Sequence, residues 1–278
     1  MFGLHFMVNA FIASTIVGVT AGAIGWFMVL RRQSFAGHTL AVVSFPGAAA
    51  AVLAGVSVSV GYFGAAVLAG VVIALVPRSS AGASLSHESA VIGTVQAFAL
   101  ACGALFVSLY GGFLGGLTSL LFGSFLGISD AQVLTLAAVA AAALAALGII
   151  ARPLFFATVD ADVALARGVP VRAVGVVFLV LLGCAAAEVS QITGALLVFA
   201  LLVMPAATAQ RLSARPVRSV LLSIAVALVV GWAGLVAAYY SVYPVGFYVT
   251  SFGFGAYLLG GGLRRRPGPV GAAPALPT

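Results

Sequence analysis

Ionisable side chains are rare in this sequence, and those within or beside apolar stretches are its candidates for chemistry. The 278 residues include three histidines and five acidic residues, scattered along the chain. His38 follows Arg31–Arg32 near the start of a predicted helix that contains Pro46–Gly47. Neutral imidazole is a common zinc ligand, and an ionisable residue near an apolar span is a functional candidate. An interfacial or helix-capping histidine would occupy the same place, so both interpretations stay open.

Glu188 is the second candidate ligand. It stands with Ser190, Gln191 and Thr193 where a predicted apolar helix ends. A carboxylate there either attracts a cation or marks the point where the helix meets water, and we favour the second interpretation.

No enzyme motif occurs in the chain. The sequence has no P-loop, no HExxH, no GxGxxG that opens a helix after a strand, and no nucleophile with a partner base. Cys102 and Cys184 lie in apolar segments without a CxxC pattern and are interpreted as small buried residues. Glu88 and Asp130 precede predicted helices and are interpreted as caps. We expect a protein that is not an enzyme, so that any ATP-driven transport would need another subunit to bind the nucleotide.

The longest polar insert, residues 152–172, contains a short predicted helix. Asp160 and Asp162 precede the helical stretch Val163–Arg167, and Gly168 closes it. Acidic residues at the first turn and glycine after the last turn are typical of a stable local helix. Such a helix between two apolar spans has the shape needed to dock on a soluble partner, although a capped connector has the same pattern.

Pro205 lies inside an apolar stretch, GALLVFALLVMPAATAQ, that begins at Gly194. Proline removes a backbone hydrogen bond, so the helix is expected to bend or break there. Neighbouring helices can satisfy the freed carbonyl, and broken helices line some transport paths. A structural kink is the alternative explanation.

The elements that position these residues are long apolar helices. The chain is 63% hydrophobic and 6% charged, with a mean hydropathy of +1.26. A soluble domain has about 25% charged residues, so the composition indicates an all-α, polytopic membrane bundle. In a soluble protein the pI of about 10.1 would suggest nucleic acid binding. Here the arginines flank spans, so no nucleic acid partner is expected.

Nine stretches have roughly the 20 apolar residues that a crossing needs. They are about 8–30, 37–57, 60–77, 90–110, 131–150, 172–188, 192–210, 217–240 and 244–263. All twelve basic residues are arginines, and this threading places every one on the same side of the membrane. Arginine and lysine concentrate in cytoplasmic loops. We therefore predict a protein of the bacterial inner membrane, with its N-terminus outside the cell and its C-terminus in the cytoplasm.

Two segments lie outside these nine spans. Residues 111–129 are apolar but rich in glycine, and a crossing there would invert every later loop. They are interpreted as a short re-entrant or external helix, with an apolar hairpin on the outer face as the alternative. Residues 1–263 are expected to form the transmembrane domain, and the proline-rich residues 264–278 a disordered cytoplasmic tail.

Four stretches, in this order and spacing, resemble the permease subunits of bacterial ABC importers for zinc, manganese or ferrous iron. LRRQSFAGHTLAVVSFPGAA, from Leu30, resembles the family's basic residues, small loop and "LPG" helix. LLFGSFLGIS, from Leu120, resembles its LLFG segment. FATVDADVALARGVPV, from Phe156, resembles its cytoplasmic helix. TGALLVFALLVMPAATAQRLS, from Thr193, is similar to its GALL…PAA helix and is the most specific of the four.

The resemblance implies partners that the spacing alone does not. Such permeases pair as dimers, bind two copies of a cytoplasmic ATPase, and receive metal from an extracytoplasmic binding protein. It implies that the metal is transported between the two permease subunits, with no permanently bound cofactor. Residues of the ATPase-coupling helix would then be Asp160, Asp162, Ala164, Arg167 and Gly168. Residues of the kinks and the path would be Pro46, Gly47, Gly194 and Pro205, with His38 and Glu188 as metal contacts.

The sequence departs from this family at one motif. Members often carry G-D-x-L-x-H at the start of the second helix, and the Asp and His are thought to face the metal path. Here His38 stands at the Asp position and Val42 at the His position. Imidazole suits zinc better than manganese, which prefers oxygen ligands, so we favour zinc and place manganese next.

Other transport classes fit the sequence less well. A permease for a metal chelate, such as a siderophore or cobalamin, is the alternative within this architecture. A secondary transporter would need acidic residues deep in its spans, and few occur here. A structural membrane protein would leave the polar insert without a role.

Overall fold

Long apolar helices make up the described part of the chain. The structure is a computed structural model that describes residues 4–75, 85–110, 127–194 and 198–262. Its helices are α1 (His5–Leu30), α2 (Ser34–Ala54), α3 (Val58–Leu75), α4 (Leu85–Leu109), α6 (Asp130–Val159), α7 (Ala161–Ala166), α8 (Val171–Thr193), α9 (Val198–Leu202), α10 (Met204–Leu212), α11 (Pro216–Tyr239) and α12 (Val245–Gly262). The predicted all-α membrane bundle is confirmed.

Seven of the described helices are long and apolar enough to cross a bilayer: α1, α2, α3, α4, α6, α8 and α11. Two further predicted crossings correspond to the broken pair α9–α10 and to the glycine-rich α12, which are not among the seven. Nine crossings therefore stay a prediction. Most of the predicted segment 111–129, and the tail 264–278, lie outside the described residues.

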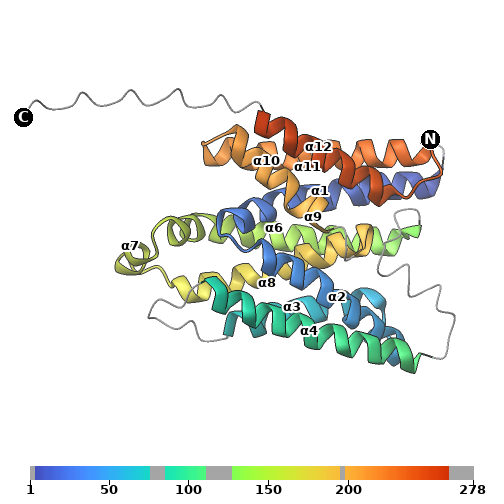
Figure 1. Ribbon diagram of the computed structural model, residues 1–278, viewed down its shortest axis with the longest axis horizontal. Helices are drawn as coiled ribbons and strands as arrows, with labels where there is room; N and C mark the ends of the chain where they lie inside the picture. Colours follow the sequence, from blue (N-terminus) through green and yellow to red (C-terminus); the bar gives the residue numbers. More distant parts are fainter. Residues whose placement is uncertain (1–3, 76–84, 111–126, 195–197, 263–278) are drawn as a thin grey trace, which may run out of the picture.

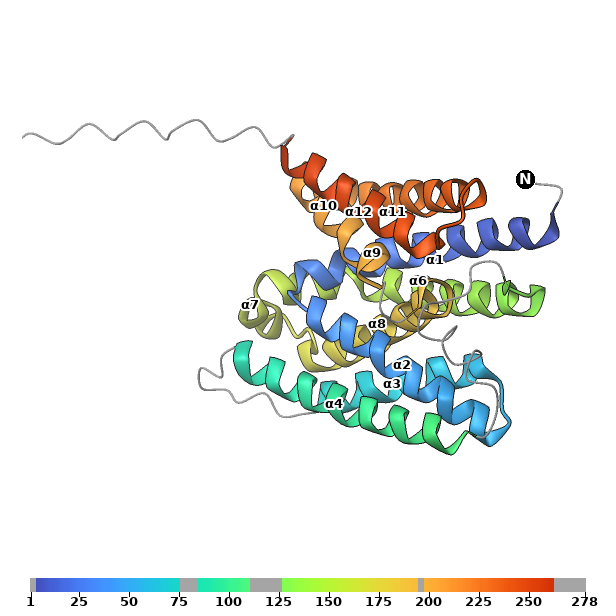
Figure 2. The ribbon, with the colours of Figure 1, turned by 45° about the vertical axis from the view of Figure 1, so that its right-hand side comes forward.

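The helices run roughly side by side, with α1, α2 and α8 at the centre (Figures 1 and 2). In each of these three, 72% of the most apolar stretch is buried, compared with 11% in α4 and 22% in α6. Two groups of helices flank the centre. One consists of α3 and α4, which pack on α2, and the other of α10, α11 and α12, which packs on α1. The outer helices α4 and α6 present most of their apolar surface outward, as expected of lipid-facing helices.

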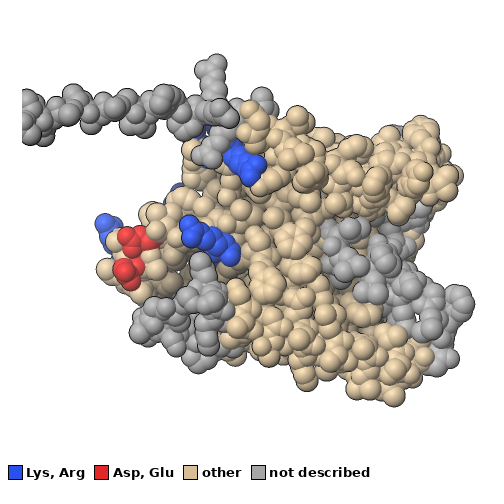
Figure 3. Space-filling view, viewed as in Figure 1, with Lys and Arg blue, Asp and Glu red and all other residues tan. Residues whose placement is uncertain are grey.

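The charged ends of the helices gather at one end of the bundle, here called the arginine end. It contains the last residues of α1, α6 and α10 and the first residues of α2, α8 and α11 (Figure 1). In the face drawn in Figure 3, the visible arginines and acids lie over this end, while the other described residues of this face are coloured as uncharged. The described arginines near it are Arg31, Arg32, Arg152, Arg167, Arg172, Arg211, Arg215 and Arg218.

Small residues let the helix backbones touch, as the small-xxx-small spacing of Gly18 and Gly22 predicts. A Cβ added to Gly22 would lie 2.6 Å from the Cα of Ile224, so α1 and α11 are in backbone contact there. Gly47 meets the backbone of Gly61 in the same way, which joins α2 to α3. Gly47 therefore has a packing role in this structure.

Two local predictions are wrong. The helix expected at 131–150 continues through Pro153 to Val159, because Leu154 and Ala157 are buried and Phe155 stacks on Trp26 at 6.4 Å. This packing outweighs the hydrogen bond that proline removes. Asp130 is also not the cap of this helix.

The cap of α6 is Ser129, which forms a capping box with Gln132. Asp130 follows it as the first helical residue and binds α1 instead. Its Oδ1 accepts hydrogen bonds from Asn9 at 2.6 Å and from the His5 ring at 3.0 Å. The side chain of Asp130 therefore joins the ends of α1 and α6 that lie opposite the arginine end.

The backbone contact at Gly22 generates a stability prediction. Gly22→Leu should lower the stability of the protein by about 2 kcal/mol or more, since backbone atoms of α11 cannot yield as a side chain does. The measurement is the thermal unfolding midpoint of the detergent-solubilised protein, followed by tryptophan fluorescence. Gly93→Leu on α4 is the control, because a Cβ at Gly93 would meet no atom within 4 Å. Equal midpoints for the two variants would contradict the contact.

Candidate functional site

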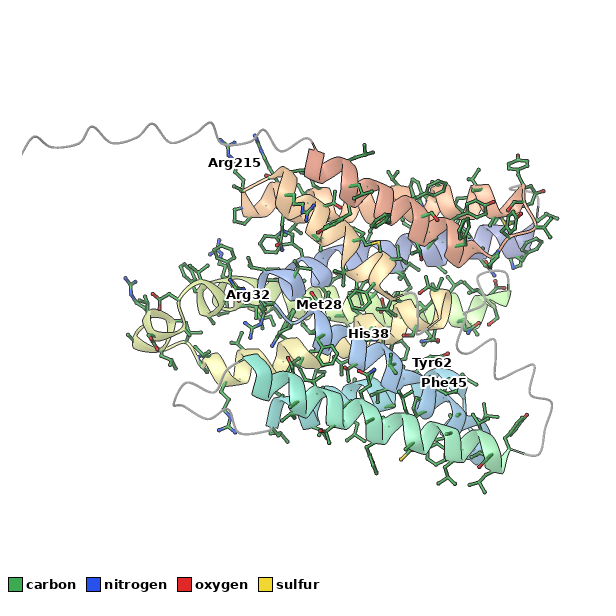
Figure 4. All side chains as sticks on the ribbon, viewed as in Figure 1. Met28, Arg32, His38, Phe45, Tyr62 and Arg215 are labelled. Atoms are coloured by element: carbon green, nitrogen blue, oxygen red, sulfur yellow. The ribbon has the colours of Figure 1, made fainter. Side chains whose placement is uncertain are left out.

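His38 lies in the first turns of α2 and faces α9. Its ring is half-buried and sits 4.9 Å from the ring of Phe199, centre to centre. The Nδ1 atom is buried and has no hydrogen-bond partner among the described residues. A buried ring nitrogen without a partner is uncommon in a folded protein and suits a ligand that binds transiently. Figure 4 shows His38 near the middle of the bundle.

The rest of this helix offers few further ligands. Val42, one turn after His38, is 7% exposed and supplies no donor atom. Thr39 is fully buried, and its hydroxyl donates to Oε1 of Gln96 on α4 at 2.8 Å. Pro46 stays within the continuous helix and is buried. Imidazole is therefore the metal-binding group that this part of α2 provides.

Glu188 has surroundings that the sequence did not predict. The side chain is 0% exposed, so the expectation that it marks where α8 meets water is wrong. Both carboxylate oxygens are buried and without a well-formed hydrogen bond among the described residues. The neighbouring hydroxyl of Thr20 on α1 donates to the carbonyl of Ile16 instead. An unpaired carboxylate costs several kcal/mol to bury, which makes Glu188 an unusual residue to find here.

The two candidate metal contacts lie in different surroundings. His38 faces α9, whereas Glu188 faces Thr20 of α1. Among the described residues, no three His, Cys, Asp or Glu side chains come together closely enough to hold a metal ion. The described part of one chain therefore presents His38 and Glu188 as separate candidate ligands.

The stretch after α8 is interrupted, as Pro205 predicts. Gly194 ends α8 with a φ of 81°, a conformation that favours glycine. The chain turns at Val203 between α9 and α10, and Pro205 stands in the first turn of α10, where no backbone donor is needed. The predicted interruption is present as a bend at Val203, one turn after Phe199 and hence near His38.

The polar insert forms a short helix, α7, which projects from the arginine end (Figure 1). Its N-cap, Asp160, accepts hydrogen bonds from the backbone of Asp162 at 3.1 Å and of Val163 at 3.0 Å. Gly168, with a φ of 78°, closes the other end. The backbone N–H groups of Gly168 and Val169 donate to Leu165 and Ala164, the pattern of a Schellman cap.

The outer face of α7 is apolar as well as charged. Val163 is 53% exposed and Leu165 57% exposed, whereas Ala164 is buried against the rest of the insert. Asp162 and Arg167 are also exposed. A rigid, doubly capped helix with apolar side chains on its surface has the properties of a docking element.

Comparisons with known proteins agree with this architecture. Residues 3–260 match the ABC 3 transport family. The chain belongs to the ABC 3 transport family. It is 30% identical over 210 residues to the manganese transport system membrane protein MntC of Halalkalibacterium halodurans, covering 76% of this chain and 70% of that protein. It is 29% identical over 239 residues to the chelated iron transport system membrane protein YfeC of Yersinia pestis, covering 86% and 80%.

A solved structure extends the likeness to three dimensions. The chain is similar to a chain of PsaBC from Streptococcus pneumoniae in complex with Fab, with a TM-score of 0.81 and 27% identity. The match covers 92% of this chain and 91% of that chain. As a member of the ABC 3 transport family, the protein is a metal-transport permease that crosses the membrane several times.

Sequence reasoning missed two features of this family member. One is the contact of Asp130 with His5 and Asn9, residues more than 100 positions away, for which the sequence holds no local signal. The other is the burial of Glu188. Polar neighbours in sequence suggested water, but Ser190 and Thr193 are buried and hydrogen-bond to backbone carbonyls, Ser190 to Ala41 and Thr193 to Val189.

The surroundings of Glu188 generate a prediction. Glu188→Met should leave the free energy of unfolding unchanged or raise it by an amount on the order of 1 kcal/mol, because an apolar side chain carries no desolvation cost. The measurement is the thermal unfolding midpoint, which should stay the same or rise. The matched control is Gln96→Met, which should lower the midpoint because it leaves the buried Thr39 hydroxyl without its acceptor. A large loss of stability in Glu188→Met would show that the carboxylate has a stabilising partner.

Proposed function

We propose that this permease carries a divalent transition metal ion into the cytoplasm, driven by ATP hydrolysis on a separate subunit. The observation that carries the proposal is α7: a doubly capped helix with an apolar outer face, at the arginine end of a chain without a nucleotide-binding motif. The ATPase-coupling residues of this helix would be Asp160, Asp162, Ala164, Arg167 and Gly168. Among these, Asp160 and Gly168 hold the shape of the helix, and the exposed residues would meet the partner.

The orientation follows from the arginines. Basic residues near span ends favour the cytoplasmic side, so the arginine end would face the cytoplasm and the start of α1 the outside. The opposite end, where Asp130 joins α1 to α6, would then face the extracytoplasmic metal-binding protein. Two permease copies would form a homodimer with the metal path between them.

Zinc is the metal favoured by the residues of this chain. His38 supplies imidazole where other members of the family carry a carboxylate, and imidazole suits zinc. Its unpartnered Nδ1 leaves a nitrogen free for transient coordination. Manganese is the second candidate, because the MntC relative is named for manganese transport. A metal chelate is the alternative cargo, since the YfeC relative is named for chelated iron.

Disruption of α7 tests the ATPase partner. Asp160→Ala removes the acceptor of two backbone N–H groups and should destabilise this short helix by about 1 kcal/mol. Replacement of Asp160–Gly168 by a Gly/Ser linker should abolish co-purification of the ATPase subunit altogether. Asp160→Asn is the matched control, because its side-chain oxygen still accepts, and it should co-purify as the unaltered chain does. Intact co-purification with the linker variant would refute the docking role.

His38 is tested by metal uptake into vesicles that contain the reconstituted complex. His38→Ala should lower uptake at limiting zinc at least several-fold, while the amount of assembled protein stays the same. Competition between zinc, manganese and chelated iron in the same vesicles identifies the cargo. Phe35→Ala, on an exposed residue of the same helix, is the control. Unchanged zinc uptake by His38→Ala would contradict the metal contact and leave His38 with a structural role.

A further inference from the structure

A groove between α1, α6 and α11 opens on the side of the bundle next to the arginine end. Its volume is about 460 Å³, which is in the range of pockets that hold a ligand. The floor is formed by Trp26 and Phe27, both nearly buried, and the rims by the exposed Phe156, Val217 and Leu221. The groove is therefore an apolar trough that widens toward the surroundings of the bundle.

The walls of the groove are held in place. The indole N–H of Trp26 donates to the hydroxyl of Ser219 on α11 at 2.7 Å, which ties α1 to α11 beneath the groove. The Trp26 ring stacks on Phe155 of α6 at 6.4 Å, which ties α1 to the other wall. These two contacts fix the walls of the trough relative to α1.

The length of the groove matches half of a bilayer. Its lining on α6 runs from Leu144 to Phe156. At a rise of about 1.5 Å per residue this distance is roughly 18 Å, of which roughly 12 Å lies between Leu144 and Arg152, compared with about 15 Å for the hydrocarbon of one leaflet. An acyl chain that enters from the side would lie along the groove, with its headgroup near the arginine end.

One charged residue lines the groove, and it is Arg152. The side chain is exposed and forms no ion pair or hydrogen bond with another described residue. No described carboxylate lines the groove. Next to it, Pro216 and Val217 begin α11, whose N-terminus has no side-chain cap. The unpaired guanidinium and the positive end of the helix dipole both favour a negative group at this mouth.

Two other apolar grooves provide an internal comparison. One lies between α2, α3 and α4 and is lined by residues such as Pro46 and Phe98, and the other lies between α11 and α12. Neither is lined by a charged residue. Lipid chains can fill any such groove, but of these three grooves between described helices the one with Arg152 combines apolar walls with a cation.

We infer that the groove between α1, α6 and α11 is a binding site for a phospholipid with an anionic headgroup. An acyl chain fills the trough over Trp26 and Phe27, and the phosphate pairs with Arg152. Basic pockets between membrane helices are known to select anionic lipids in this manner. A second copy of the chain fits this surface less well. Two concave faces related by a two-fold axis leave a gap between them, and the symmetry would bring one Arg152 toward the other.

The test measures lipid binding to the purified, assembled full-length protein by native mass spectrometry. The probes are phosphatidylglycerol, phosphatidylcholine and inorganic phosphate. The unaltered protein should bind phosphatidylglycerol more tightly than phosphatidylcholine. Arg152→Gln should weaken phosphatidylglycerol binding roughly five-fold, the effect of one basic residue at a membrane surface. Arg172→Gln is the matched control, because Arg172 is exposed at the same end but does not line the groove.

A second variant tests the apolar part of the site. Gly148 lines the groove, and a Cβ there would meet no atom within 4 Å, so Gly148→Leu should fill the trough without disturbing the fold. The preference for phosphatidylglycerol over phosphatidylcholine should then be lost. Gly64→Leu on α3, where a Cβ also meets nothing within 4 Å, is its control and should bind lipid normally.

Several results would overturn the site. If Arg152→Gln and Arg172→Gln weaken phosphatidylglycerol binding equally, the lipid is attracted by the arginine end as a whole and not by the groove. Normal lipid binding by Gly148→Leu would place the lipid elsewhere. Displacement of phosphatidylglycerol by inorganic phosphate would identify a phosphate site, and dissociation of a dimer by Gly148→Leu would identify a subunit interface. None of these results bears on metal transport, so the site and the proposed function fail independently.

Discussion

Hydrocarbon solvates neither a guanidinium group nor an open backbone amide, and this constraint organises the whole chain. Backbone polar groups within the bilayer must pair inside helices, so the described chain is a set of long helices with short connections. The described arginines gather at one end, where Arg152 lies about two turns before the end of α6. The candidate functional groups are therefore few: the capped helix α7 at the arginine end, and a small number of polar side chains within the bundle.

Those polar side chains differ in how they are satisfied. Thr39 and Gln96 pair with each other, and Thr193 donates to the backbone of its own helix. The Nδ1 of His38 and the carboxylate of Glu188 lack such partners in the described structure. Polar groups left unpaired in a membrane bundle are costly and tend to have a function. His38 faces Phe199 of α9, which supports its proposed role in the metal path, whereas Glu188 is fully buried.

Much of the fold follows from composition and spacing, because burial in lipid imposes a strong pattern. The apolar stretches, the break near Pro205 and the helix that Asp160 and Gly168 enclose were all predictable, since each depends on local residues. The length of α6 and the partners of Asp130 and Glu188 were not. They depend on packing between distant segments, such as Phe155 on Trp26 or Asn9 on Asp130. The family motifs located the candidate site, but a single sequence holds no record of which side chains meet across helices.

The glycine contacts also limit how the molecule can move. Where the backbones of α2 and α3 touch at Gly47 and Gly61, and those of α1 and α11 touch at Gly22, neither helix can slide or roll past its neighbour without a collision. Each pair must travel as one rigid body. A movement of the α1–α11 pair relative to the α2–α3 pair would therefore occur by hinge rotation, and the short connection at Arg31–Gln33 is where the chain can supply the hinge.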